Sequence, residues 1–62
     1  MHFRVICRAS DGPYRGFILS RDRITAPNWG AAKQWAHGRC FVLALVHGCH
    51  VLYTFTCERT VQ

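Results

Sequence analysis

The first residues of the chain alternate between apolar and basic positions. In the segment 2–9, HFRVICRA, one set of alternate positions holds Phe3, Val5, Cys7 and Ala9, and the other holds His2, Arg4, Ile6 and Arg8. A period of two is typical of a strand. The pattern therefore predicts a strand with one mostly apolar face and one mostly basic face. The turn signals of SDGPYRG follow, and we expect a hairpin into a second strand near residues 14–24, whose alternation is poorer.

The period changes in residues 25–38, TAPNWGAAKQWAHG. Asn28 is a residue type that favours the N-cap of a helix, and good helix formers follow it. Gly38 stands where helices commonly end in a left-handed residue. We predict a helix of about nine or ten residues, too short to persist without packing. Its inward stripe is predicted to contain Ala32, Trp35 and Ala36, with Trp29 a turn earlier.

The last third of the chain is rich in apolar residues. The segments CFVLALV and CHVLYTFTCER are predicted to form two strands around a tight turn at His47 and Gly48. The first of them is apolar on both faces, which is typical of a central strand. We expect core positions for Trp35, Phe41, Tyr53 and Phe55. The predicted fold is α+β, an antiparallel sheet of about four strands with one helix on one face, in the order β-β-α-β-β.

A length of 62 residues indicates a single domain, 1–62, with a small core. The N-terminal sequence lacks the apolar segment of a signal peptide, which predicts reduced cysteines in the cytoplasm. The longest apolar run, residues 41–46, is far shorter than the roughly 20 residues that span a bilayer. We therefore expect a soluble protein with no membrane partner.

The charge of the chain favours functions that involve a negatively charged partner. Eight basic residues face three acidic ones, and seven of the eight are arginine. Arginine pairs bidentately with phosphate and carboxylate, and a net charge of +5 on a small surface attracts polyanions. Neighbouring strands could gather these side chains into one patch that binds phosphates or an acidic protein surface. The candidate partner-binding residues are Arg4, Arg8, Arg15, Arg21, Arg23, Lys33 and Arg39, and Arg59 completes the basic residues.

Histidine and cysteine in HGRCFVLALVHGCH raise the question of a metal site. His37 and Cys40 would supply the four ligands of structural zinc together with two of the residues His47, Cys49 and His50. A strand over residues 40–46 would hold the two groups on the order of 20 Å apart, and no Cys-x2-Cys occurs. A zinc-stapled interaction module is therefore a minor alternative, and we expect no metal or other cofactor. A disulfide would need the sheet to place Cys7 beside another cysteine.

The acidic residues give little support for catalysis. Asp11, Asp22 and Glu58 are the only carboxylates, and no pair of them suits general acid and base roles. No glycine-rich phosphate loop occurs, since the five glycines are scattered. We expect a protein that is not an enzyme and works by binding.

The segment APNWGAAKQWAHGRCFVLALVHGCHVLYTF resembles a pattern in very small phage-encoded proteins, among them some anti-CRISPR inhibitors of type I effector complexes. The resemblance covers residues 25–57 and consists of a strand, an Ala-rich basic helix, a short turn and a final hairpin. It implies a protein without catalysis that acts in the host bacterial cytoplasm. Such a protein sits on a Cas subunit or its nucleic-acid channel and blocks target DNA, with Lys33 and Arg39 as contact residues.

The leading hypothesis from the sequence is a phage-type, anti-CRISPR-like inhibitor whose basic patch binds a CRISPR effector complex. The alternative is a small basic protein that binds DNA or RNA directly through the same patch. A homodimer is compatible with either hypothesis, formed by extending the sheet edge or by burying Trp29.

Overall fold

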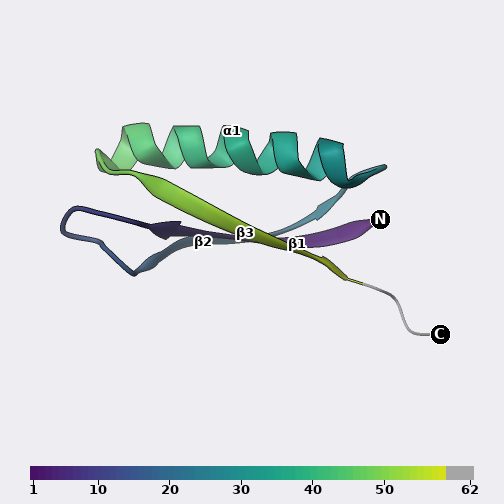
Figure 1. Ribbon diagram of the computed structural model, residues 1–62, viewed down its shortest axis with the longest axis horizontal. Coiled ribbons are helices and arrows are strands. Elements are labelled where there is room, and N and C mark those ends of the chain that lie inside the picture. Colours follow the sequence, from purple (N-terminus) through teal and green to yellow (C-terminus); the bar gives the residue numbers. More distant parts are fainter. Residues whose placement is uncertain (59–62) are drawn as a thin grey trace.

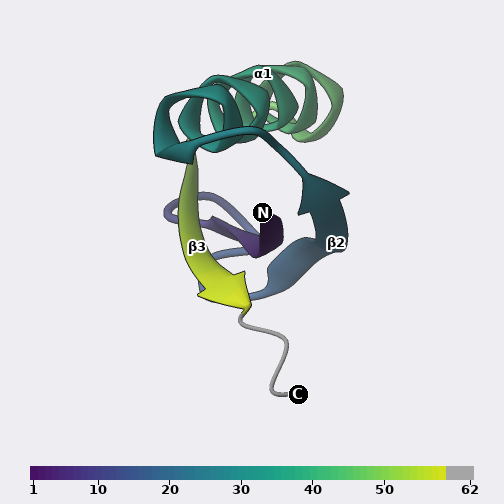
Figure 2. The same ribbon diagram turned by 90° about the vertical axis from the view of Figure 1, so that its right-hand side faces the viewer.

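The computed structural model describes residues 1–58, which form a small α+β fold with one helix and a three-stranded antiparallel sheet (Figure 1). The elements in chain order are β1 (His2–Ala9), β2 (Ile18–Thr25), α1 (Trp29–His47) and β3 (Val51–Glu58). The sheet order is β2-β1-β3, so the first strand lies in the centre. The helix lies along one face of the sheet, as Figure 2 shows from the end.

The predicted fold class and the single helix over one sheet face are confirmed, but the predicted fourth strand is wrong. Residues 40–46 continue α1, which runs for 19 residues from Trp29 to His47. A short run that is apolar on every side fits a buried strand and a helix equally well, so its periodicity does not distinguish them. Leu and Ala within this run favour a helix, and no turn separates the run from the preceding helical segment.

The ends of α1 explain why the helix is long. Asn28 is the N-cap as predicted, and its side-chain oxygen accepts a hydrogen bond of 2.8 Å from the backbone N–H of Ala31. Gly38, the predicted C-terminal residue, lies inside the helix. The left-handed residue is Gly48, with φ 64°, and its N–H donates to the carbonyl of Ala44 at 2.8 Å. The predicted hairpin turn is therefore a helix C-cap.

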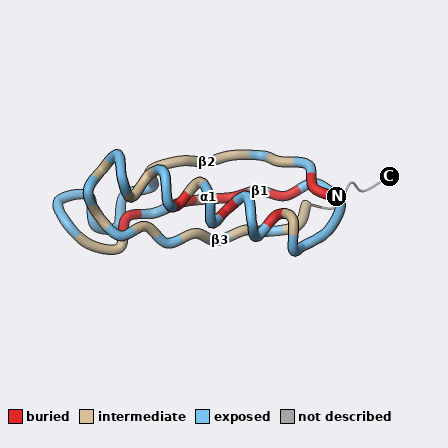
Figure 3. Tube along the Cα trace, turned by 90° about the horizontal axis from the view of Figure 1, so that it is seen from above, coloured by how far each residue is buried: buried red, intermediate tan, exposed pale blue. Residues whose placement is uncertain are grey.

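The predicted alternation of β1 is confirmed. The helix-facing side chains of Phe3, Val5, Cys7 and Ala9 are all buried. The strand lies between its two neighbours, so that Val5 is flanked by Asp22 and Phe55. Figure 3 shows the resulting line of buried residues along the middle of the molecule.

The core between the helix and the sheet is built from small residues on the helix side. Ala32, Ala36 and Cys40 are the buried residues of α1, spaced four apart. The predicted inward positions of Ala32 and Ala36 are thus confirmed. Trp35 and Phe41 are exposed instead, because the inward stripe runs through positions 32, 36 and 40, and the period of 3.6 residues places positions 35 and 41 away from it.

Aromatic rings from the start of α1 and from β3 pack together beside this core. Trp29 is half exposed, but its ring packs edge-on against Phe3 with a centroid separation of 5.2 Å. Tyr53 and Phe55 are partly buried and pack against the core, in agreement with the prediction for these two residues. None of the helical segments within residues 1–58 is long and apolar enough to cross a membrane.

Candidate binding surface

The sheet face opposite the helix is uncovered and carries the second set of alternate residues. The strand register arranges them in four rows across β2, β1 and β3. From one end of the sheet to the other, the rows are Ile18, Arg8, Leu52; Arg21, Ile6, Thr54; Arg23, Arg4, Thr56; and Thr25, His2, Glu58. We call these twelve residues the open face.

Four of the seven predicted partner-binding residues come together on the open face: Arg4, Arg8, Arg21 and Arg23. Arg4 lies directly opposite Arg23, and Arg21 lies opposite Ile6 in the next row. Neighbouring strands are about 4.8 Å apart, and alternate residues of one strand about 6.6 Å apart. The arginines therefore form one cluster that spans β1 and β2.

The other three predicted residues lie elsewhere. Arg15 belongs to the turn between β1 and β2, and Lys33 is exposed on α1. Arg39 points from the helix to β2, where its Nη2 lies 3.2 Å from Asp22 Oδ1. Its guanidinium also lies 5.1 Å from the ring centre of Trp35. Arg39 therefore holds the helix on the sheet, and Arg59 lies outside the described residues.

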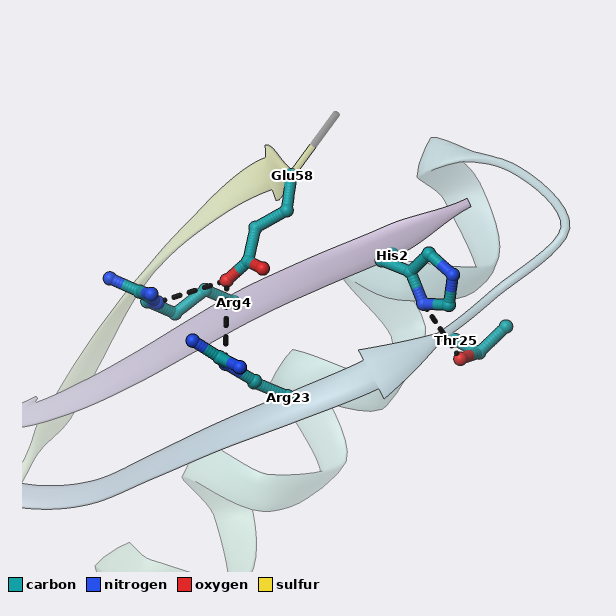
Figure 4. A network of polar contacts seen from close by, with 5 residues as sticks. All are labelled: His2, Arg4, Arg23, Thr25 and Glu58. Carbon is teal, nitrogen blue, oxygen red and sulfur yellow. Dashed lines mark hydrogen bonds and ion pairs between the residues drawn. The ribbon is translucent and has the colours of Figure 1, made fainter. Parts of the chain in front are cut away.

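Glu58 is a member of the open face that the sequence did not predict (Figure 4). Its Oε1 lies 3.0 Å from Arg4 Nε and 3.6 Å from Arg23 Nε. Like charges that face each other on neighbouring strands are unfavourable, and an anion between them relieves this repulsion. The carboxylate thus occupies a position suited to a phosphate oxygen. Its role depends on the pairing of β3 with β1. The sequence predicted instead a pairing of the last strand with residues 40–46.

The open face also carries hydroxyl and apolar groups. His2 Nδ1 lies 3.2 Å from Thr25 Oγ1 at the end of the sheet (Figure 4). Ile6 separates the arginines of β2 from the threonines of β3, and Leu52 is exposed beside Arg8. The surface is shallowly hollowed on both sides of Ile6. It offers charge and hydrogen-bond donors without a deep pocket, as a binding surface for an extended partner would.

The cysteines are free, and two of them meet in the core. The sulfurs of Cys7 and Cys40 are 3.9 Å apart, between β1 and the helix. Burial, and then the neighbouring Cys7 thiol, raise the pKa of Cys40 to about 11. Within residues 1–58, no three His, Cys, Asp or Glu side chains lie close enough together to hold a metal ion.

A second titratable pair joins two loops at the end of the molecule. The carboxylate of Asp11 contacts the ring Nδ1 of His50 and accepts a 2.8 Å hydrogen bond from the His50 backbone N–H. The side-chain hydrogen bond raises the pKa of His50 above 6.5 and lowers the pKa of Asp11 below 3.8. Both groups are exposed, and the described contacts join neither side chain to a thiol or hydroxyl nucleophile. They serve to tie the β1–β2 loop to the segment after α1.

A comparison with protein-family models finds no match for the chain, and comparisons with curated proteins and with solved structures find none either. The anti-CRISPR resemblance therefore remains a prediction.

Proposed function

We propose that this protein is a nucleic-acid-binding module without catalytic activity, and that its open face contacts the phosphate backbone. The observation that carries the proposal is the clustering of Arg4, Arg8, Arg21 and Arg23 on an uncovered sheet face. Arginine forms bidentate, charge-assisted hydrogen bonds with phosphate. Because rigid strands hold these arginines, binding a regularly spaced polyanion costs little backbone entropy.

The composition of the open face favours a duplex over a single strand. Proteins that bind single strands stack bases on aromatic side chains. None of the twelve open-face positions is Phe, Tyr or Trp, because these residues lie on the helix side or in connecting segments. Contacts to backbone phosphates need no stacking surface. The proposed ligand is therefore double-stranded nucleic acid, bound with little dependence on sequence.

Glu58 acts as an internal competitor in this proposal. Its carboxylate neutralises part of the charge of Arg4 and Arg23 in the unbound protein. A backbone phosphate would displace it and take over the two guanidinium groups. The displacement weakens binding, whereas in the free protein the carboxylate prevents the opposed arginines from destabilising the sheet.

Fluorescence anisotropy with a labelled DNA duplex tests the proposal. The comparison is between Arg21→Ala and Lys33→Ala, which remove the same charge from the open face and from the helix. We expect Arg21→Ala to weaken binding and Lys33→Ala to leave it nearly unchanged. Each phosphate contact contributes about −0.9 to the slope of log K against log salt, so four arginines predict a slope of about −3.6 and Arg21→Ala reduces its magnitude by about one.

Two results would contradict the proposal. Equal losses in Arg21→Ala and Lys33→Ala would mean that only the net charge matters. No binding of duplex or single strands at low salt would exclude direct nucleic-acid binding.

The second candidate function is the phage-type, anti-CRISPR-like inhibitor that binds a nucleic-acid-processing complex, such as a CRISPR effector, and blocks target DNA. It is favoured by the apolar side chains of Ile6 and Leu52 among the arginines, since arginine with an apolar centre is typical of protein interfaces. The test is affinity capture from a bacterial lysate with and without nuclease. A protein partner that remains after nuclease treatment, and is lost with Arg21→Ala, supports this function. Capture that disappears with nuclease supports the first proposal.

A further inference from the structure

The outer side of α1 carries an apolar patch that nothing covers in the single chain. Phe41, Val42, Leu45 and Val46 are exposed by 67%, 51%, 70% and 72%. They lie at positions i, i+1, i+4 and i+5, on the side of the helix away from the buried Ala36 and Cys40. A helix that is apolar all round is normally buried on both sides. We define these four residues as the helix patch.

The single chain has a small core, so burying more apolar surface would stabilise the fold further. Within residues 1–58 the buried residues are few, and the largest fully buried side chains, Phe3, Val5 and Cys7, all belong to β1. Domains of this size usually need a disulfide, a metal or a partner chain. All four thiols are free, and residues 1–58 contain no metal-binding cluster. A partner chain is therefore the remaining means of stabilisation.

The shape of the patch suits a second copy of the same chain. Gly38 lies one turn before Val42, and no atom lies within 4 Å of the position that a Cβ would occupy there. The surface around it is a shallow groove lined by Gln34, Trp35, Gly38, Arg39 and Val42. Gly38, Val42 and Val46 follow one another at intervals of four residues along one ridge of the helix. Gly38 lies in the groove at one end of this ridge, Val46 projects at the other end, and Val42 is at its centre. Two antiparallel helices related by a twofold axis at Val42 would therefore place each Val46 over the other copy's Gly38.

The size and charge of the patch also point to a second copy. At their observed exposures, the four side chains present on the order of 500 Å² per copy, at the upper end of patches on monomers. Two copies bury about 1,000 Å² in total, the lower bound of a specific interface. A lipid surface fits less well, because the arginine cluster lies on the opposite side of the molecule, where it could not reach headgroups.

We propose that two copies of this protein pair through their helix patches. The dimer has four layers, sheet, helix, helix and sheet, with an open face on each outer surface. A consequence that rests on the proposed function is that one dimer holds two nucleic-acid segments at once.

The first test measures the mass of the full chain without nucleic acid, by light scattering after size exclusion at micromolar concentrations. The expected mass is twice the chain mass of 7.1 kDa. Leu45→Glu should give a folded monomer, judged by circular dichroism. The matched control is Leu52→Glu, which places the same charge at a 65% exposed leucine of the open face and should remain dimeric.

A second variant separates loss of pairing from loss of folding. Gly38→Gln fills the groove with a better helix former, so it favours α1 in the monomer while blocking the partner's Val46. We expect it to be monomeric with undiminished helix content. A wild type that stays monomeric in the light-scattering measurement, even when its concentration is raised to about 100 μM, would overturn the proposal. So would a dimer that survives both Leu45→Glu and Gly38→Gln, which would indicate pairing through a sheet edge.

A bead assay tests the consequence separately. Beads carrying one duplex should capture a second, fluorescent duplex through the wild type but not through Leu45→Glu, which should still bind a single duplex by anisotropy. A wild-type dimer that binds no duplex would overturn the proposed function and leave the dimer standing. A monomer that binds duplex would do the reverse.

Discussion

The two exposed surfaces of this protein differ in nearly every physical property. The open face is built on three strands and gathers four arginines around the apolar side chain of Ile6, with Ile18 and Leu52 beside Arg8. The helix patch is uncharged and consists of four apolar side chains beside a glycine. They lie on opposite sides of one thin core. This contrast underlies the two partners that we propose: a polyanion that pairs with the arginines, and a second apolar surface that covers the helix patch.

The largest expected effect comes from the core that both surfaces share. Phe3→Ala removes a fully buried ring and should destabilise the fold by about 3–5 kcal/mol. A domain of this length has about 3–9 kcal/mol to lose. Thermal unfolding should show a much lower midpoint, and duplex binding and dimer formation should be lost together as the variant unfolds. Retention of only one of the two would mean that the surfaces do not depend on a common fold.

The reactivity of Cys40 tests whether the core between the helix and the sheet excludes solvent. Its pKa of about 11, against an ordinary value of 9.0, reduces the thiolate about a hundredfold at neutral pH. Mass spectrometry after timed alkylation should find Cys49 and Cys57 modified first and Cys40 much later. Alkylation of Cys40 at the rate of Cys49 would mean that the helix opens from the sheet readily.

A change at Glu58 should affect the open face alone. Glu58→Gln removes the carboxylate that lies between Arg4 and Arg23, and we expect duplex affinity to rise by about threefold to tenfold at low salt. The mass of the protein in solution should stay the same. Thr56→Gln, on the same strand and face without an ionic contact, is the control. Unchanged duplex affinity in Glu58→Gln would show that the Glu58 carboxylate does not compete with phosphate for the arginines.

The smallest effect concerns the loops at the end of the molecule. The raised pKa of His50 adds stability that is present below pH 6.5 and is lost as the pH rises through that raised value. The lowered pKa of Asp11 adds stability that is present above pH 3.8 and is lost as the pH falls through that lowered value. Asp11→Asn should therefore lower the unfolding midpoint most between pH 3.8 and 6.5, with both binding surfaces intact.

The control for this pair is the NMR titration of the four histidine rings. The amide oxygen that Asp11→Asn introduces can still accept the His50 backbone N–H, so only the ionic part of the contact is removed. The midpoint of His50 should fall in the variant. A midpoint that does not move would show that the Asp11 contact is absent in solution.

The strand β1 could be predicted from the sequence because one of its faces is buried and the other is charged. The alternation of Phe3, Val5 and Cys7 with basic residues admits only one period. The same pattern placed Arg4 and Arg8 correctly on one surface, and the pairing of β2 with β1 brings Arg21 and Arg23 beside them. The β1 part of the candidate site was therefore readable before the sheet order was known.

The segment 40–46 could not be predicted in the same way, because its residues are apolar in every direction. Without a polar face, the run shows no period. Gly38 was predicted to end the helix, but the C-cap is Gly48. The error also hid the helix patch, since Phe41 was expected in the core and is exposed. Arg39 was missed as a structural residue because its partner Asp22 is 17 residues away, on a strand whose buried face was unclear.

The central claim is that the arginines of the open face contact nucleic acid, and NMR of the arginine side chains tests it most directly. Spectra of the arginine Nε–Hε groups and of the backbone amides would be recorded while a short DNA duplex is added to the wild-type protein at physiological salt. We predict that the signals of Arg4, Arg8, Arg21 and Arg23 shift together, while those of Arg15 and Arg39 stay in place. Shifts confined to the amides of residues 41–46, or no shifts at all, would contradict the claim.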